Sequence, residues 1–78
     1  MNYTENDLPV VIKEAETVTL DDGTEIRFEE SGGARDVMIG GDWSPRATLF
    51  PGNEYILNGS GNGYLLTATD DALEVKKA

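Results

Sequence analysis

The sequence contains neither cysteine nor histidine, and these two absences exclude much of the chemistry that small proteins commonly use. Without cysteine there is no disulfide bond and no thiol nucleophile. Without histidine there is no imidazole base, no Ser-His-Asp triad and no histidine ligand for a metal. The glycine-rich residues 59–63 have no lysine after them, so they do not form a phosphate-binding loop and instead predict a flexible hairpin tip. An enzyme is therefore the least favoured class of protein.

Carboxylates are the acid–base groups that remain. The pairs Asp21-Asp22 and Asp70-Asp71 fit turns, where aspartate side chains bond nearby backbone groups, and neither pair has the ligand spacing of a calcium loop. Asp42 is different because it precedes Trp43, and an apolar pocket raises the pKa of a carboxyl group. The simpler interpretation is that Asp42 caps a corner. We expect no catalytic residue, no cofactor and no bound metal.

Long apolar segments are also missing. No run approaches the ~20 apolar residues that cross a membrane as a helix, and the N-terminus is acidic and polar, unlike a secretory signal. We expect synthesis in the cytoplasm and no contact with a membrane. The length of 78 residues corresponds to one domain.

Basic residues are scarce. There are 15 acidic and 6 basic residues, for a net charge of −9, and nine of the acids lie in residues 1–30. This balance disfavours direct binding to nucleic acid, which depends on lysine and arginine. Two interpretations stay open: a solubilising surface, or an acidic face that docks on a basic partner or imitates a phosphate backbone. The residues proposed for that acidic face are Glu14, Glu16, Glu25 and Glu29.

Residues 37–57 hold the single tryptophan of the chain, Trp43. Aromatic side chains bury the most area per residue, so Trp43 is expected at the centre of the core. Its expected neighbours are Val37, Ile39, Leu49 and Ile56.

Residues 17–28 predict a β-hairpin around Asp21-Asp22-Gly23. A three-residue loop pairs Leu20 with Thr24 and Val18 with Ile26, which keeps the apolar side chains on one face. Gly23 then takes the left-handed conformation of a bulged turn.

Residues 46–50 and 54–57 predict a second hairpin around Pro51-Gly52-Asn53, because proline followed by glycine suits a type II turn. Further strands are expected at Val10–Ile12, Ala34–Ile39, 64–69 and 73–75, with a short helix over 11–18 as the alternative for the first. Turns recur about every 8–12 residues, which is typical of all-β folds. The fold class we predict is a small antiparallel β-sandwich or β-barrel of about six to eight short strands joined by hairpins.

Residues 1–9 predict an irregular, flexible N-terminal arm in front of a single β domain at 10–78, because they are polar without periodicity. The alternative is an arm that lies on a neighbouring subunit, with Tyr3 and Leu8 as its anchors. Arg35 and Arg46 are isolated cations in an acidic molecule and are expected to pair with Asp36 and Asp42. Trp43 and Arg46 complete the expected partner-binding set.

The segment IGGDWSPRATL, at residues 39–49, resembles a pattern in small bacteriophage proteins. In those proteins a glycine, an aromatic residue and a short gap precede an Ala-Thr-x-Leu-like strand of a compact β fold. The resemblance implies a virion component of the decoration, head-fibre or head–tail joining type, and it transfers no functional residue. Pro45-Arg46 stands where those proteins have small residues.

The function we expect is therefore a non-enzymatic structural or interaction module. The leading form is a small virion protein that binds a capsid, another assembly or copies of itself. The alternative is an acidic inhibitor that imitates nucleic acid and blocks a basic partner.

Overall fold

The chain forms two β-sheets in the computed structural model, which describes residues 2–41, 44–58 and 63–78. The first sheet has the strand order β1 (Asn2–Thr4), β3 (Thr17–Thr19), β4 (Glu25–Ser31), β5 (Ala34–Ile39) and β6 (Ala47–Leu49). The second has the order β2 (Val10–Ile12), β9 (Leu73–Lys77), β8 (Gly63–Ala68) and β7 (Glu54–Asn58). The prediction of an all-β chain is confirmed, with nine strands and one 3-10 turn, η1 (Glu5–Asp7), in the described residues.

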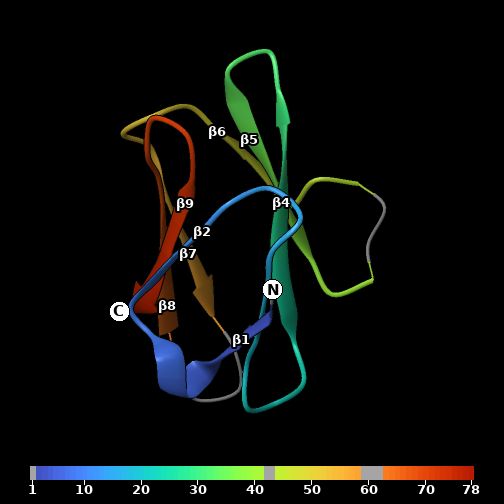
Figure 1. Ribbon diagram of the computed structural model, residues 1–78, viewed down its shortest axis with the longest axis vertical. Coiled ribbons are helices and arrows are strands. Elements are labelled where there is room, and N and C mark those ends of the chain that lie inside the picture. The colour runs from blue at the N-terminus through green and yellow to red at the C-terminus, as the bar shows by residue number, and fades with distance from the viewer. Residues whose placement is uncertain (1, 42–43, 59–62) are drawn as a thin grey trace.

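The two sheets form separate layers whose inward faces share one hydrophobic cluster (Figure 1). Alternate residues of each strand point inward, as a sheet with one buried face requires. Strand pairing in the described residues stays within each sheet, so the sheets do not close on each other. None of the described residues belongs to a helix long and apolar enough to cross a membrane. The cluster includes Ile12, Val18, Ile26, Phe28, Val37, Leu66, Leu73 and Val75.

The predicted hairpin of β3 and β4 is confirmed with its register. Val18 pairs with Ile26, and the Leu20 amide donates to the Thr24 carbonyl at 2.8 Å. Gly23 has a φ of +89°, which is the left-handed conformation that the three-residue loop requires.

The predicted second hairpin is wrong. Strand β6 pairs with β5 in the first sheet, and β7 pairs with β8 in the second. A tight turn is present, since the Asn53 amide donates to the Phe50 carbonyl at 2.8 Å and Gly52 has a φ of +92°. The turn reverses the chain but carries it from one sheet to the other. Strand β8 pairs with all 5 residues of β7, whereas β6 has only 3 residues to offer β7.

Within the irregular N-terminal arm predicted at residues 1–9, residues 2–7 instead have regular secondary structure. Strand β1 pairs in parallel with β3, and η1 follows it. The Asp7 carboxylate accepts hydrogen bonds from the Thr4 amide at 2.8 Å and the Thr4 hydroxyl at 3.4 Å. Glu5 is buried, which fastens this segment to the β domain. The mobility of residues 1–9 in solution stays a prediction.

The expectation of a core centred on Trp43 is only partly addressed, because Asp42 and Trp43 lie outside the described residues. Val37, Ile39 and Leu49 are buried as expected. Ile56 is not, since its side chain is 59% exposed. Its neighbours Tyr55 and Leu57 face the core, and alternation along β7 therefore turns Ile56 to the solvent.

Candidate functional site

A buried carboxylate, Glu5, joins three separate parts of the chain. Its Oε1 accepts hydrogen bonds from the Tyr64 hydroxyl at 2.8 Å and from the Asp21 amide at 2.9 Å. Its Oε2 lies 3.4 Å from the Lys77 Nζ. The Asp21 amide and the Tyr64 hydroxyl lower the pKa of Glu5, although burial acts in the opposite direction. Burial and the bond to Glu5 raise the pKa of Tyr64 to about 12. Glu5 is thus held as an anion by fixed donors, which suits a structural role and not proton transfer.

A buried guanidinium, Arg35, joins the two sheets at another point. Its Nη1 donates to the Gly33 carbonyl at 2.9 Å, and its Nη2 donates to the Thr69 carbonyl at 2.9 Å and to the Asp70 carbonyl. Glu30 Oε2 lies 3.7 Å from Nη1. The expected pairing of Arg35 with Asp36 is wrong, because Asp36 faces the other side of β5 and accepts from the Thr48 hydroxyl at 2.9 Å. Arg35 therefore links β5 to the turn between β8 and β9.

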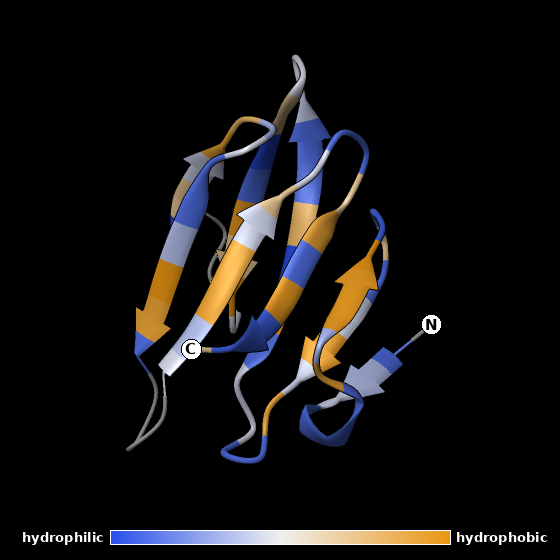
Figure 2. Cartoon of the chain, turned by 90° about the vertical axis from the view of Figure 1, so that its left-hand side faces the viewer, coloured by the Kyte–Doolittle hydropathy of each residue, from blue (hydrophilic) through white to orange (hydrophobic). Residues whose placement is uncertain are grey.

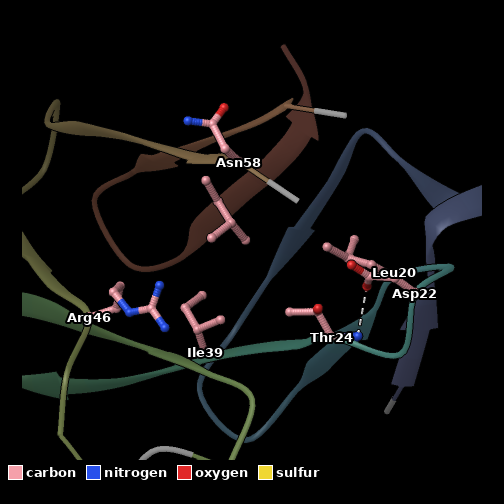
Figure 3. A pocket seen from close by; sticks show the side chains of 7 residues that line it. Leu20, Asp22, Thr24, Ile39, Arg46 and Asn58 are labelled. Carbon is pink, nitrogen blue, oxygen red and sulfur yellow. Dashed lines mark hydrogen bonds between the residues drawn. The ribbon is translucent and has the colours of Figure 1, made fainter. Parts of the chain in front are cut away.

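A cavity of about 290 Å³ opens between the β3–β4 turn and the end of β7 (Figure 3). Its described lining combines apolar side chains with one acid, one base, one amide and one hydroxyl group. Its Asp22 carboxylate accepts from the Thr24 amide at 2.9 Å, as aspartate commonly does in a turn. This composition suits the binding of a small polar molecule, and Asp22 is the one carboxylate among the described residues that line the cavity. The lining residues are Leu20, Asp22, Thr24, Ile39, Arg46, Leu57 and Asn58.

Of the described residues predicted to bind a partner, Tyr3 and Arg46 lie at opposite edges of the first sheet. Tyr3 and Leu8 are half-buried and pack against the core of their own chain. The Tyr3 hydroxyl also donates to Glu16 at 3.5 Å. Arg46 is exposed at the rim of the cavity, and Trp43 lies outside the described residues. Their role in binding a partner stays a prediction.

The four acids predicted as one surface divide into two pairs. Glu25 and Glu29 are exposed on the outward face of β4, where Arg27 lies between them and approaches Glu29 at 3.4 Å. Glu14 accepts from the Glu30 amide at 3.0 Å, and Glu16 accepts from the Lys13 amide at 2.7 Å. Among the described residues, Glu14 and Glu16 thus accept hydrogen bonds from backbone amides of their own chain. Glu25 and Glu29 have the cationic Arg27 between them.

The second sheet has apolar side chains on its outward face that the sequence analysis did not identify. Ile56 is 59% exposed and Val11 is 50% exposed, and Leu65, directly opposite Ile56 on β8, is half-buried. Figure 2 shows this sheet in front, with hydrophobic bands on neighbouring strands. We call Ile56 and Leu65 the apolar outer face; Val11 is separated from them by Glu74 and Lys76 of β9. The sequence shows only that Ile56 faces the opposite side from Tyr55 and Leu57, because alternate residues of a strand share a face.

Charged side chains in the described residues do not assemble a metal centre, since no three of their carboxylates gather closely enough to hold an ion. Comparison with models of protein families, with curated proteins and with solved structures gives no match for this chain. Its function is therefore inferred from its own residues.

Proposed function

We propose that this chain is a non-enzymatic interaction module with a β-sandwich fold, of the kind that decorates or assembles a virion. It binds other proteins through its surface. The observation that carries this proposal is the apolar outer face, in which Ile56 and Leu65 are directly opposite on neighbouring strands. The buried charges support it as well, because Glu5 and Arg35 are both engaged in holding strands together.

The energetic argument concerns where the apolar side chains of a small protein lie. Burying a valine, leucine or isoleucine side chain contributes roughly 1.5–3 kcal/mol to the stability of the fold. A short chain has few such residues, so leaving several exposed is costly for its stability. Single exposed apolar residues are normal on protein surfaces. A cross-strand pair such as Ile56 and Leu65 is different, since contiguous apolar area is typical of protein interfaces.

The test is co-sedimentation with an assembled particle. The chain is co-expressed with the proteins encoded beside its gene, and the particles are separated on a density gradient. We expect the chain to sediment with them, and the double variant Ile56→Thr with Leu65→Thr to remain at the top. Threonine suits strands, so the fold is kept. The matched control is Phe50→Ser, which removes a side chain that is 55% exposed but lies outside the apolar outer face. A wild-type chain that never sediments with a particle contradicts the proposal.

The second candidate is an acidic inhibitor that imitates nucleic acid. It is favoured by the net charge of −9 and by the exposure of Glu25 and Glu29 on one face. It ranks second because Arg27 lies between these two acids and because Glu14 and Glu16 bond their own backbone. Its signature is binding to a nucleic-acid enzyme that weakens steeply with salt. Binding that persists after all four glutamates are changed to glutamine excludes it.

A further inference from the structure

Strand β7 is an edge strand whose outward backbone groups are available. The Ala68 amide donates to the Asn53 carbonyl at 3.0 Å, which sets the phase of the β7–β8 ladder. Hydrogen-bonded pairs alternate along an antiparallel ladder, so Tyr55 and Leu57 bond β8. The amides and carbonyls of Glu54, Ile56 and Asn58 consequently point away from β8. No described residue bonds these outward groups, and all three residues are exposed.

The edge strand on the other side of the second sheet, β2, is protected. Pro9 precedes it and has no amide hydrogen to donate. The Lys13 amide, directly after it, donates to Glu16 Oε1 at 2.7 Å. Proline and local capping of this kind are how edge strands avoid pairing with another chain.

The edges of the first sheet are protected in the same manner. On β1 the Thr4 amide donates to the Asp7 carboxylate at 2.8 Å. Near β6, Pro45 lacks an amide hydrogen and the Phe50 amide donates to Asn53 Oδ1 at 3.1 Å. Pro51 precedes β7 as Pro45 precedes β6, but among the four edges in the described part of the chain β7 is the one where no described side chain caps an outward amide.

The sequence of β7 is complementary to itself in an antiparallel arrangement. A two-fold axis at Ile56 places Glu54 opposite Asn58 and Tyr55 opposite Leu57, so no like charges meet. The outward groups of the three residues then form about six backbone hydrogen bonds. On the apolar outer face, the Ile56 side chains of the two copies lie side by side between the two Leu65 side chains.

We propose that β7 pairs with β7 of a second copy of this chain, which joins the two second sheets into one continuous sheet. The apolar outer face becomes continuous across the two-fold axis, and Tyr55 of the second copy lies beside Leu57 at the cavity. This dimer deepens the proposed function, on which it rests, by naming one partner of the module. Isologous pairing about a two-fold axis is the commonest form of self-association.

The first experiment is sedimentation velocity over a range from about 1 to 500 μM, which brackets the affinities of weak protein dimers. We expect twice the monomer mass at the upper end. Ile56→Pro removes an outward amide but no β7–β8 hydrogen bond, since proline is tolerated on an edge strand. Two hydrogen bonds of the dimer are lost, so the association constant falls by about 30-fold or more. The matched control is Val11→Pro, which makes the same change on β2 and leaves dimerisation intact.

A second variant keeps the proposal testable if Ile56→Pro does not fold. Ile56→Cys introduces the single cysteine of the chain, and its copies face each other across the two-fold axis. Their Cα atoms are expected about 5.5 Å apart, within the range of a disulfide. We expect mild oxidation to give a covalent dimer for Ile56→Cys but not for the control Val11→Cys.

The outcomes separate this inference from the proposed function. A wild-type chain that stays monomeric at about 500 μM overturns the β7 pairing, as does a dimer that Ile56→Pro leaves unchanged or Val11→Pro disperses. Sedimentation with particles in the same preparation then shows that the interaction module still stands. A dimer lost with Ile56→Pro, in a chain that sediments with no particle, confirms the pairing and contradicts the virion role.

Discussion

The Tyr64 hydroxyl donates a hydrogen bond of 2.8 Å to Glu5 Oε1 across a sequence separation of 59 residues. Tyr64 lies on β8 of the second sheet, and Glu5 begins η1, directly after the edge strand of the first. Both residues are buried. The bond therefore fixes the position of the N-terminal segment against the opposite layer.

Tyr64→Phe is expected to lower the free energy of unfolding by about 1–2 kcal/mol, because a buried acceptor loses its donor while the ring is kept. Urea denaturation followed by circular dichroism measures this change. Tyr55→Phe makes the same chemical change at a half-buried site on β7 and is expected to have a smaller effect. Equal effects of the two variants would contradict the role assigned to the Tyr64–Glu5 bond.

Acid is expected to remove the stabilising contribution of Glu5. The folded protein lowers the pKa of this carboxyl below its ordinary value of 4.5. The contribution is therefore fully present above about pH 4.5 and is lost as the pH falls through the lower, folded pKa. The measurement is the difference in unfolding free energy between wild type and Glu5→Gln from pH 7 to pH 2. This difference should shrink below pH 4.5, and a constant difference would exclude the linkage.

Alkali is expected to act through Tyr64. Its pKa is raised from 10.0 to about 12 in the folded protein, so the unfolded chain releases the proton first. The stabilising contribution is complete below pH 10 and declines as the pH rises towards 12. Absorbance of the phenolate during a pH titration reports the ionisation, and Tyr64→Phe should reduce the late step, to which Tyr3 also contributes because burial and Glu16 raise its pKa. A full tyrosine titration centred at pH 10 would contradict the buried setting of Tyr64.

Arg35→Lys is expected to destabilise the protein by about 2 kcal/mol or more, since an ammonium group does not reproduce the planar fork that bonds several carbonyls. Urea denaturation again provides the measurement. Arg27→Lys serves as the control, because Arg27 is on the surface and its pair with Glu29 is worth at most about 1 kcal/mol. A loss no larger than that of the control would show that the bonds to Gly33, Thr69 and Asp70 add little.

Gly23→Ala is expected to cost about 1–2 kcal/mol, because φ at this position is +89° and an L-residue is strained there. The strain lies in the backbone alone, since an added Cβ would meet nothing within 4 Å. Gly41→Ala is the matched control: its added Cβ also meets nothing, and Gly41 has no positive φ. Thermal unfolding of both variants decides whether the left-handed turn is required, and equal midpoints would contradict it.

The sequence predicts the fold best where the information is local. In the β3–β4 hairpin, Gly23 sets the turn and the alternation of Val18 and Ile26 sets the register, and both act within a dozen residues. The Pro51-Gly52 turn is also local and is present. Its flanking strands choose distant partners, which the turn does not encode.

The candidate sites depend on relationships that hydrophobic alternation does not reveal. In the sequence Glu5 looks like one more polar residue of the N-terminal arm, because only the fold brings Tyr64 of β8 within hydrogen-bond distance of it. In the sequence Arg35 looks like a surface cation, because only the fold brings the carbonyl acceptors of the β8–β9 turn to its guanidinium group. Ile56 is predicted in the core because it is apolar, and its neighbours Tyr55 and Leu57 are apolar too, so the sequence does not show which of the three faces outward.

The contact between Lys77 and Glu5, with Nζ and Oε2 3.4 Å apart, brings two ends of the described chain together. A circular permutant follows from this proximity: a short glycine linker joins the old ends, and new ends open at the exposed Asp70-Asp71 turn. In that rearranged gene, β1 and η1 follow β9 through the linker, and Glu5 then lies close to Lys77 in sequence as well as in space.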